Sequence, residues 1–465
     1  MINPRNIACT ALALSLVAVA FAQEEERQTP PSGGTPKDFV LPAKDTFILD
    51  NGLQATLIPF GSVPKATVRI IVRSGNLNEG SQTWLADLSG DFFLEGTTSR
   101  SGEDIARAAA AIGGQINVAV NEDQTTISGD VLAEFTPQMV ELLAEVVRTP
   151  AFAESELDRL KRDRLRQLSI AQTQPQQMAI AAFREALYGD HPYGRLMPDE
   201  AQLAAYSMED VRNFYHNNFG AQRTHVYVAG VFDANATRVA VESSFDDWEE
   251  GPDVLIDIPE PVTGKVALDV VDRPDASQSN VILGLPTVSP SHDDWIALQI
   301  SNTLLGGYFS SRITANIRED KGYTYSPYST LSTRYKDAYW AQIAAVTTNV
   351  TGPALQEIMN EIDNLQENPP PVEELDGVKN YSAGVFVLQN STRGGIINVL
   401  NRLDLQELPD TYLTDYVSNV FAITPEQVSE MASTYMREED MTLAVVGDRG
   451  QISEQVAPFI DVKEK

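Results

Sequence analysis

Strand-like and helix-like hydrophobic patterns alternate along most of the chain. Short apolar runs at 47–49 and 53–58 flank Asp50-Asn51-Gly52, and an Asn-Gly turn between two such runs predicts a β-hairpin. Apolar residues at helical spacing follow threonine and proline starts at 136–146 and again at 351–365. Hairpins mixed with amphipathic helices predict an α+β fold, in which helices pack on one face of a mainly antiparallel sheet.

A long repeat divides the chain into two related halves. The pattern Glu-Leu-Asp-x-x-Lys at 156–161 recurs at 374–379, and a capped helix leading into a strand at 207–230 recurs at 424–447. The two offsets are 218 and 217 residues. Because an offset of this length far exceeds a solenoid repeat, it indicates two related domains rather than an array.

The segment between the two halves has the composition of a linker. Residues 249–263 are acidic and contain three prolines, which favours an extended connection. We therefore predict an N-terminal domain at 43–248 and a C-terminal domain at 264–460.

The N-terminus predicts export. Residues 1–22 combine Arg5, a short apolar run and a small-x-small end at Ala20-Phe21-Ala22, which is typical of a secretory signal peptide. The run is too short to span a bilayer comfortably, which takes about 20 apolar residues. Residues 23–42 are rich in Glu, Pro and Gly and predict a flexible lead-in. We expect a periplasmic or otherwise exported, soluble protein with no membrane span after cleavage.

Composition excludes several classes of function. The chain has 34 Lys and Arg against 65 Asp and Glu, a net charge of −31, so most of its surface would repel nucleic acid. Cys9 is the only cysteine and lies in the predicted signal peptide, so we expect neither a disulfide nor a thiol nucleophile in the mature protein.

The histidines do not form a local metal motif. There are four, His191, His216, His225 and His292, and no two are spaced to share a helix face. His191 begins a His-Pro-Tyr-Gly loop and is expected to be structural. The chain has no nucleophile elbow, phosphate-binding loop or dinucleotide fingerprint. The residues alone therefore contain no obvious catalytic machinery.

One segment nevertheless points to a known family. Residues 304–326 join a Gly-Gly break to a short helix, which Gly322 ends before a strand begins at Tyr323. Together with Asn-Gly-Leu at 51–53, His-Pro-Tyr-Gly at 191–194 and Val-Asp-Arg-Pro at 271–274, this segment resembles the pitrilysin/insulinase family of zinc peptidases, in its mitochondrial-processing-peptidase-like branch. The resemblance implies two duplicated α+β halves that form half of a clamshell.

The resemblance also implies peptide hydrolysis, but this chain departs from the family at every chemical position. The family holds zinc with an inverted His-x-x-Glu-His motif and a glutamate about 76 residues further on. Counted from Glu95-Gly96-Thr97, Asp87 and Asp91 replace the two histidines, Gly90 replaces the general base and Gln167 replaces the distal glutamate.

Two interpretations of these acidic residues stay open. Asp87, Asp91 and Glu95 share a helix face, so oxygen ligands for Ca²⁺ or Mg²⁺ are conceivable. A solvated acidic helix face is the interpretation that the sequence favours. We expect no metal and no cofactor in this chain.

The second half retains a pair of residues to which the resemblance assigns the positioning of substrate. In this branch an Arg/Tyr pair reaches substrate across the complex, and Arg318 and Tyr325 match that pair. A guanidinium donates in a fixed fork to peptide carbonyls, and a phenol can stabilise oxyanion charge. The alternatives are that Arg318 caps its helix, that Tyr325 is a half-buried strand residue, and that Tyr323 is the relevant tyrosine.

These features lead to one hypothesis and two competitors. The hypothesis is a non-catalytic subunit of an exported heterodimeric zinc peptidase, in which a zinc-bearing family member is the partner and a peptide is the substrate. The first competitor is a stand-alone peptide-binding or assembly protein without hydrolysis. The second is an autonomous hydrolase with a metal site rebuilt at Asp87 and Asp91.

Overall fold

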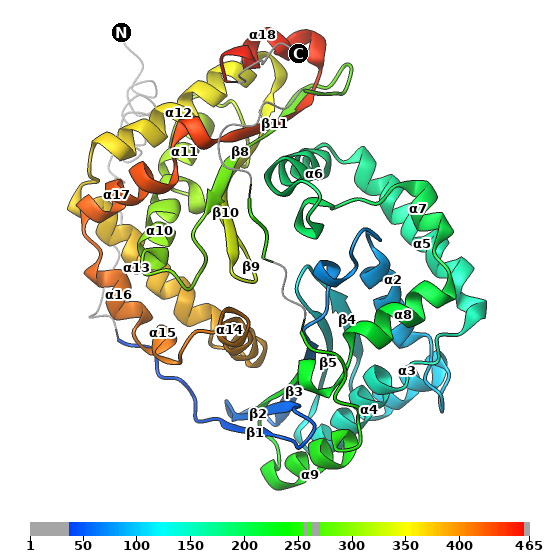
Figure 1. Ribbon diagram of the computed structural model, residues 1–465. Coiled ribbons are helices and arrows are strands. Elements are labelled where there is room, and N and C mark those ends of the chain that lie inside the picture. Colours follow the sequence, from blue (N-terminus) through cyan, green and yellow to red (C-terminus); the bar gives the residue numbers. More distant parts are fainter. Residues whose placement is uncertain (1–36, 255–257, 262–269, 460–465) are drawn as a thin grey trace, which may run out of the picture. The chain divides into compact units, whose positions relative to one another are not determined.

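The computed structural model describes residues 37–254, 258–261 and 270–459 (Figure 1). The predicted signal peptide, most of the predicted lead-in and part of the predicted linker lie outside the described residues. Among the helices of the described ranges, none combines the length and the hydropathy that crossing a membrane requires.

The first half is built on a six-stranded sheet. Its strands run in the order β1 (Asp45–Ile48), β2 (Gln54–Pro59), β6 (Thr224–Gly230), β3 (Lys65–Val72), β5 (Thr125–Leu132) and β4 (Ile116–Val120). All neighbours are antiparallel except β2 and β6, which are parallel. The predicted Asn-Gly turn connects β1 to β2, where Gly52 adopts a φ of 85°.

The helices of the first half follow in chain order. They are α2 (Leu85–Asp91), α3 (Gly102–Ala111), α4 (Thr136–Arg148), α5 (Glu154–Thr173), α6 (Pro175–Tyr188), α7 (Glu200–Ala205), α8 (Met208–Asn218) and α9 (Ala234–Phe245). Apolar side chains from α2, α4, α8 and α9 pack with one face of the sheet in a single core.

The second half repeats this plan with five strands. Their order is β7 (Val271–Asp272), β11 (Thr442–Gly447), β8 (Gln278–Thr287), β10 (Asp337–Thr347) and β9 (Tyr328–Arg334). Only β7 and β11 are parallel. Both sheets are therefore mixed and mainly antiparallel, which confirms the predicted α+β class.

The helices of the second half lie mostly on one side of its sheet, as Figure 1 shows for α10, α12 and α17 beside β8 and β10. They are α10 (Trp295–Asn302), α11 (Arg312–Thr314), α12 (Thr351–Glu367), α13 (Val372–Gln389), α14 (Arg393–Gln406), α15 (Thr411–Thr414), α16 (Tyr416–Ala422), α17 (Pro425–Tyr435) and α18 (Arg449–Val456). The repeated helices α8 and α17 both begin with a capping box, at Ser207 and Thr424.

The opposite face of each sheet is covered by a helix from the other half. Helix α6, from the first half, packs Ala179, Phe183 and Leu187 against β8, β10 and β11 of the second sheet. Helix α14, from the second half, packs Ile396 and Leu400 against β2, β3 and β6 of the first sheet. The sequence prediction placed helices on one face only, because periodicity does not say which sheet a helix covers.

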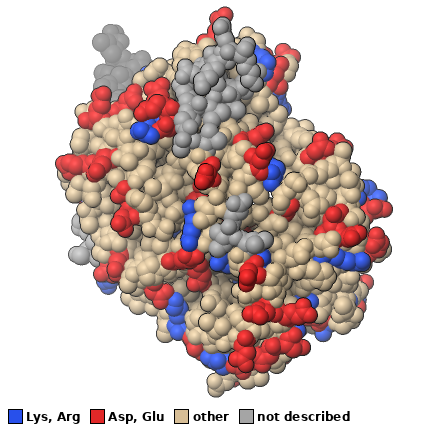
Figure 2. Space-filling model, in the orientation of Figure 1, with Lys and Arg blue, Asp and Glu red and all other residues tan. Residues whose placement is uncertain are grey.

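Charged side chains are spread over the surface. Figure 2 shows Asp and Glu distributed over most of the visible face, with Lys and Arg between them. On this face the net charge of −31 is thus not gathered into one acidic groove.

The packing of α6 from the first half on the sheet of the second half generates a prediction about stability. The ring of Phe183 is fully buried and meets that of Tyr339 on β10 edge-on, with centroids 5.4 Å apart. We expect F183A to lower the free energy of unfolding by about 3–5 kcal/mol, because it leaves a cavity between α6 and β10. Urea unfolding followed by tryptophan fluorescence measures this loss. The control is I170A on the half-exposed surface of α5; an equal loss in both variants would contradict the packing.

Candidate functional site

The N-terminus of α2 is held by a buried glutamate. Glu79 accepts the backbone N–H groups of Trp84 and Ala86, both at 3.0 Å, and the side-chain amide of Asn76 at 3.2 Å. Asn76 also donates to the Asp87 carboxylate at 2.7 Å. These contacts orient α2, which carries Asp87, Gly90 and Asp91.

Arg164 of α5 lies against both aspartates of α2. Its Nε and Nη2 donate to the two carboxylate oxygens of Asp91, at 2.6 and 2.7 Å. Its Nη1 donates to the carboxylate of Asp87 at 3.1 Å, and Nη2 donates to the backbone carbonyl of Asp87 at 2.9 Å. Gln167, one turn further along α5, accepts from Nη1 at 3.2 Å. Three of the four positions that are expected from the sequence to replace the family's chemical residues therefore contact one guanidinium.

This cluster is mostly withdrawn from water. The Arg164 side chain is 14% exposed. Burial raises the pKa of Asp87 and of Asp91, and the guanidinium opposes both shifts. Burial alone would lower the pKa of Arg164, but its hydrogen bonds to Asp91 and the charge of Asp87 outweigh that effect and raise it. Arg164 therefore stays charged.

Gly90 packs closely against β4. A Cβ atom at this position would lie 2.6 Å from Cγ2 of Val120 on β4. Since a real Cβ does not approach a carbon so closely, a side chain at position 90 would require the Val120 side chain to shift.

The donors present here do not suit zinc. The carboxylates of Asp87 and Asp91 bind a guanidinium, so a metal ion between them would have to displace it. Glu95, the third residue of the conceivable hard-cation site, instead pairs with Arg159 at 2.6 Å. Within the described ranges, no three or more His, Cys, Asp or Glu side chains are grouped to hold a metal. The interpretation as a solvated acidic face is also wrong, because Asp87 and Asp91 are paired and partly buried.

The sequence analysis assigned no role to Arg164. The available signal was its position three residues before Gln167, which places both side chains on one face of α5.

The structure brings Arg318 and Tyr325 together. Arg318 belongs to the π-helical segment Ala315–Asp320, and its guanidinium carbon lies 5.0 Å from the centre of the Tyr325 ring. The ring of Phe309 lies on the same guanidinium at 4.3 Å. All three line a hollow of about 390 Å³.

The backbone between them explains this arrangement. Gly322 adopts a φ of 66°, and the N–H of Tyr323 donates to the carbonyl of Ile317 at 2.8 Å, so the chain turns back on its helix. Tyr323 is partly buried against the second core, whereas Tyr325 is 78% exposed. The alternative of a half-buried Tyr325 is therefore wrong, and of the two tyrosines it is Tyr325 that stands in solvent beside Arg318.

Two protein-family models match the chain. Residues 61–199 match the model described as insulinase (peptidase family M16), and residues 205–382 match the model described as the peptidase M16 inactive domain. These ranges cover most of both halves.

Bacterial relatives span nearly the same length. An uncharacterized zinc protease of Bacillus subtilis is 24% identical over 410 residues, covering 87% of this chain and 98% of that protein. An uncharacterized zinc protease of Mycobacterium tuberculosis is 27% identical over 377 residues, covering 79% and 82%.

Two solved structures share the fold. A peptidase M16 inactive domain from Pseudomonas fluorescens superposes with a TM-score of 0.80 at 22% identity, over 87% of this chain and 98% of that chain. A protease from Helicobacter pylori gives a TM-score of 0.81 at 18% identity, over 88% and 100%.

The Arg164 cluster generates a prediction about stability. Removing one partner of a largely buried ion pair leaves uncompensated charge, so we expect R164Q to lower the free energy of unfolding by about 3 kcal/mol. The matched control is R166Q on the same helix, where the side chain is exposed and pairs with Asp163. The free energy of unfolding of R166Q should fall by less than about 1 kcal/mol. Urea unfolding at neutral pH measures both, and equal losses would refute the buried cluster.

Glu79 generates a prediction about pH. Burial raises the pKa of Glu79 to about 8, although its backbone partners and Asn76 oppose the shift. The folded state therefore holds the proton more tightly than the unfolded state. The stability that this proton contributes is complete below the ordinary pKa of 4.5 and is lost as the pH rises toward about 8.

The variant E79Q cannot ionise, so its stability should fall less than that of the wild type between pH 5 and pH 8. Urea unfolding at several pH values measures the difference, with E134Q at an exposed position as the control. Parallel pH profiles of wild type and E79Q would show that Glu79 is ionised throughout.

Proposed function

Because the chain belongs to the M16 (insulinase) family of peptidases, we propose that it is the non-catalytic subunit of a heterodimeric zinc peptidase. In this proposal, a second family member carries His-x-x-Glu-His, binds zinc and cleaves the peptide. This chain contributes part of the chamber wall together with Arg318 and Tyr325. The signal-peptide pattern of residues 1–22 places the complex outside the cytoplasm in this proposal.

The proposal rests mainly on the contacts that the guanidinium of Arg164 makes. It binds Asp87, Asp91 and Gln167, the positions that the family resemblance assigns to metal ligands. A guanidinium is always protonated, so it supplies a fixed positive charge between α2 and α5. The two helices are thus tied together without a metal, while Gly90 offers no group to activate water.

The surroundings of Arg318 support a role in holding substrate. Rings of Phe309 and Tyr325 orient its guanidinium, and Glu319 pairs with its Nε at 3.1 Å. Within the described part of the chain, its Nη1 and Nη2 have no hydrogen-bond or ion-pair partner. Such a guanidinium can donate to peptide carbonyls, and the exposed phenol of Tyr325 can donate to an oxyanion.

The test is reconstitution with a partner. The tagged mature chain is purified from its host, and a stoichiometric second chain carrying His-x-x-Glu-His is sought. We expect the mixture of the two chains to hydrolyse a quenched fluorescent peptide library. Neither chain alone should hydrolyse it. R318A in the mixture should lower kcat/KM by about tenfold to a hundredfold, because a donor to the substrate is lost. Y325F, which keeps the ring beside Arg318, should lower kcat with less effect on KM.

The control is R437A, at an exposed arginine that pairs with Asp440. Unchanged kinetics of R318A in an active pair would refute the assigned role of that residue. Recovery of this chain alone, with peptide binding but no hydrolysis, would favour the stand-alone peptide-binding or assembly protein. Metal-dependent cleavage by the purified chain, abolished in D91A, would favour the autonomous hydrolase.

A further inference from the structure

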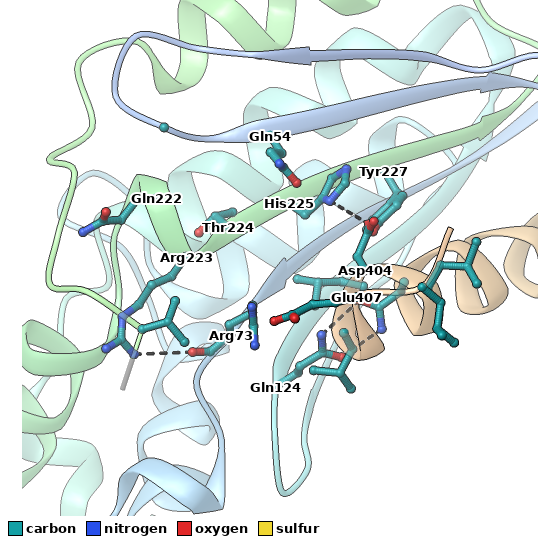
Figure 3. Close-up of a pocket in the computed structure, with 17 residues that line it drawn as sticks. Gln54, Arg73, Gln124, Gln222, Arg223, Thr224, His225, Tyr227, Asp404 and Glu407 are labelled. Carbon is teal, nitrogen blue, oxygen red and sulfur yellow. Dashed lines mark hydrogen bonds and ion pairs between the residues drawn. The ribbon is translucent and has the colours of Figure 1, made fainter. Parts of the chain in front are cut away.

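A polar pocket lies where the first sheet meets the C-terminal part of α14 (Figure 3). Its volume is about 340 Å³. Strands β2 and β6 and the residue after β3 form one wall, with Gln54, His225 and Arg73. Helix α14 contributes Asn401 and Asp404 to the opposite wall. Both halves of the chain therefore contribute to this pocket, which is separate from the Arg164 cluster and from Arg318.

Arg73 supplies a positive charge that no side chain of the described ranges binds by a hydrogen bond. Its backbone N–H donates to the carbonyl of Arg223 at 2.8 Å, and its guanidinium lies over the ring of Tyr335 at 4.8 Å. Within the described ranges this guanidinium makes no hydrogen bond or ion pair, and Figure 3 shows it among the labelled side chains that line the pocket. A guanidinium fork in this setting suits a carboxylate.

A hydrogen bond from Lys336 and, less strongly, the charge of Arg73 lower the pKa of the neighbouring Glu407. Arg73 and Glu407 therefore interact, but Glu407 makes its hydrogen bonds to other residues. Glu407 also lines the pocket, but its two oxygens are bound by the Tyr335 hydroxyl and by Lys336, both at 2.7 Å. By contrast, the guanidinium of Arg223 is hydrogen-bonded, since it donates to the carbonyls of Asn218 and Pro252.

Asp404 supplies a negative charge in the same pocket. Its Oδ2 accepts from the Tyr227 hydroxyl and lies 3.0 Å from Nδ1 of His225. The other nitrogen of His225 lies 2.8 Å from the Thr56 hydroxyl, and the ring stacks on Tyr227. These contacts fix the carboxylate and use only Oδ2. Among the described contacts of Asp404, Oδ1 has none.

The presence of opposite charges in one small cavity restricts which charged groups a ligand can carry. An inorganic anion would be attracted by Arg73 but repelled by Asp404, and a metal cation would experience the reverse. A ligand that carries a carboxylate and an ammonium group satisfies both. The volume is at the lower end of the range for small-molecule pockets, about 300–1,000 Å³, which excludes a long peptide.

We propose that this pocket binds a zwitterionic amino acid or dipeptide, with its carboxylate on Arg73 and its ammonium group on Asp404. The reciprocal amide pair of Gln124 and Asn401, with N–O distances of 3.0 and 2.8 Å, forms a fixed wall beside the ligand. This site goes beyond the proposed function and does not depend on it, because its measurement is binding to the single chain rather than hydrolysis.

The test is isothermal titration calorimetry of the full chain with four probes: alanyl-alanine, its N-acetyl derivative, its C-terminal amide and sulfate. We expect saturable binding of alanyl-alanine only. R73Q and D404N should each weaken that binding by about tenfold or more, because each removes a charge-assisted contact. The control R166Q, on the surface of α5, should bind as the wild type does.

Four results would overturn the proposal, and three of them concern the dipeptide probes. They are absence of alanyl-alanine binding at about 10 mM, unchanged affinity in both R73Q and D404N, and equal binding of the acetylated or amidated probe. Sulfate binding as tight as that of the dipeptide would indicate a simple anion site and would also overturn it. Because the probe series uses the wild type, the proposal stays testable even if a variant does not fold.

Discussion

The apolar faces that each half leaves uncovered constrain the whole molecule. Strand β10 is buried along almost its full length, on both faces, yet the helices of its own half pack on one of them. Helix α6 covers the other face, and α14 does the same for the first sheet. Exposed apolar area of this extent is strongly unfavourable in water, so neither half can complete its own core. The fold is therefore one cooperative unit despite its internal repeat, and the exchange also brings Asp404 and Asn401 of α14 to the ends of the first-half strands.

One guanidinium balances the charge of two partly buried carboxylates on α2. Two carboxylates that project from α2 need a positive charge if they are to stay buried. Arg164 provides it from α5 with five hydrogen bonds in a planar fork. A zinc ion can additionally polarise a bound water, whereas a guanidinium has no open coordination position. In the proposed function, the guanidinium thus keeps the two helices together without supplying the chemistry of a metal ion.

The sequence was informative where interactions are local or repeated. The hairpin at Asn51-Gly52, the helices α4 and α12, and the two capped helices α8 and α17 all follow from patterns within about 15 residues. The family resemblance located Asp87, Gly90, Asp91 and Gln167, but not their environment. The contact of Arg164 with Asp91 joins residues 73 apart, and it depends on how α5 packs on α2. The open guanidinium of Arg73 and the helix exchange depend on tertiary packing in the same way, so no periodicity could reveal them.

The contact between Gly90 and Val120 bears on how the proposed loss of chemistry could be reversed. In the proposed function, replacing Asp87 and Asp91 with histidine would leave the Arg164 guanidinium close to both positions. A glutamate at position 90 would require the side chain of Val120 to shift. Positions on α2, α5 and β4 are therefore coupled through packed or paired side chains. In the proposed function, this coupling favours retention of the present residues over a return to a zinc-binding set.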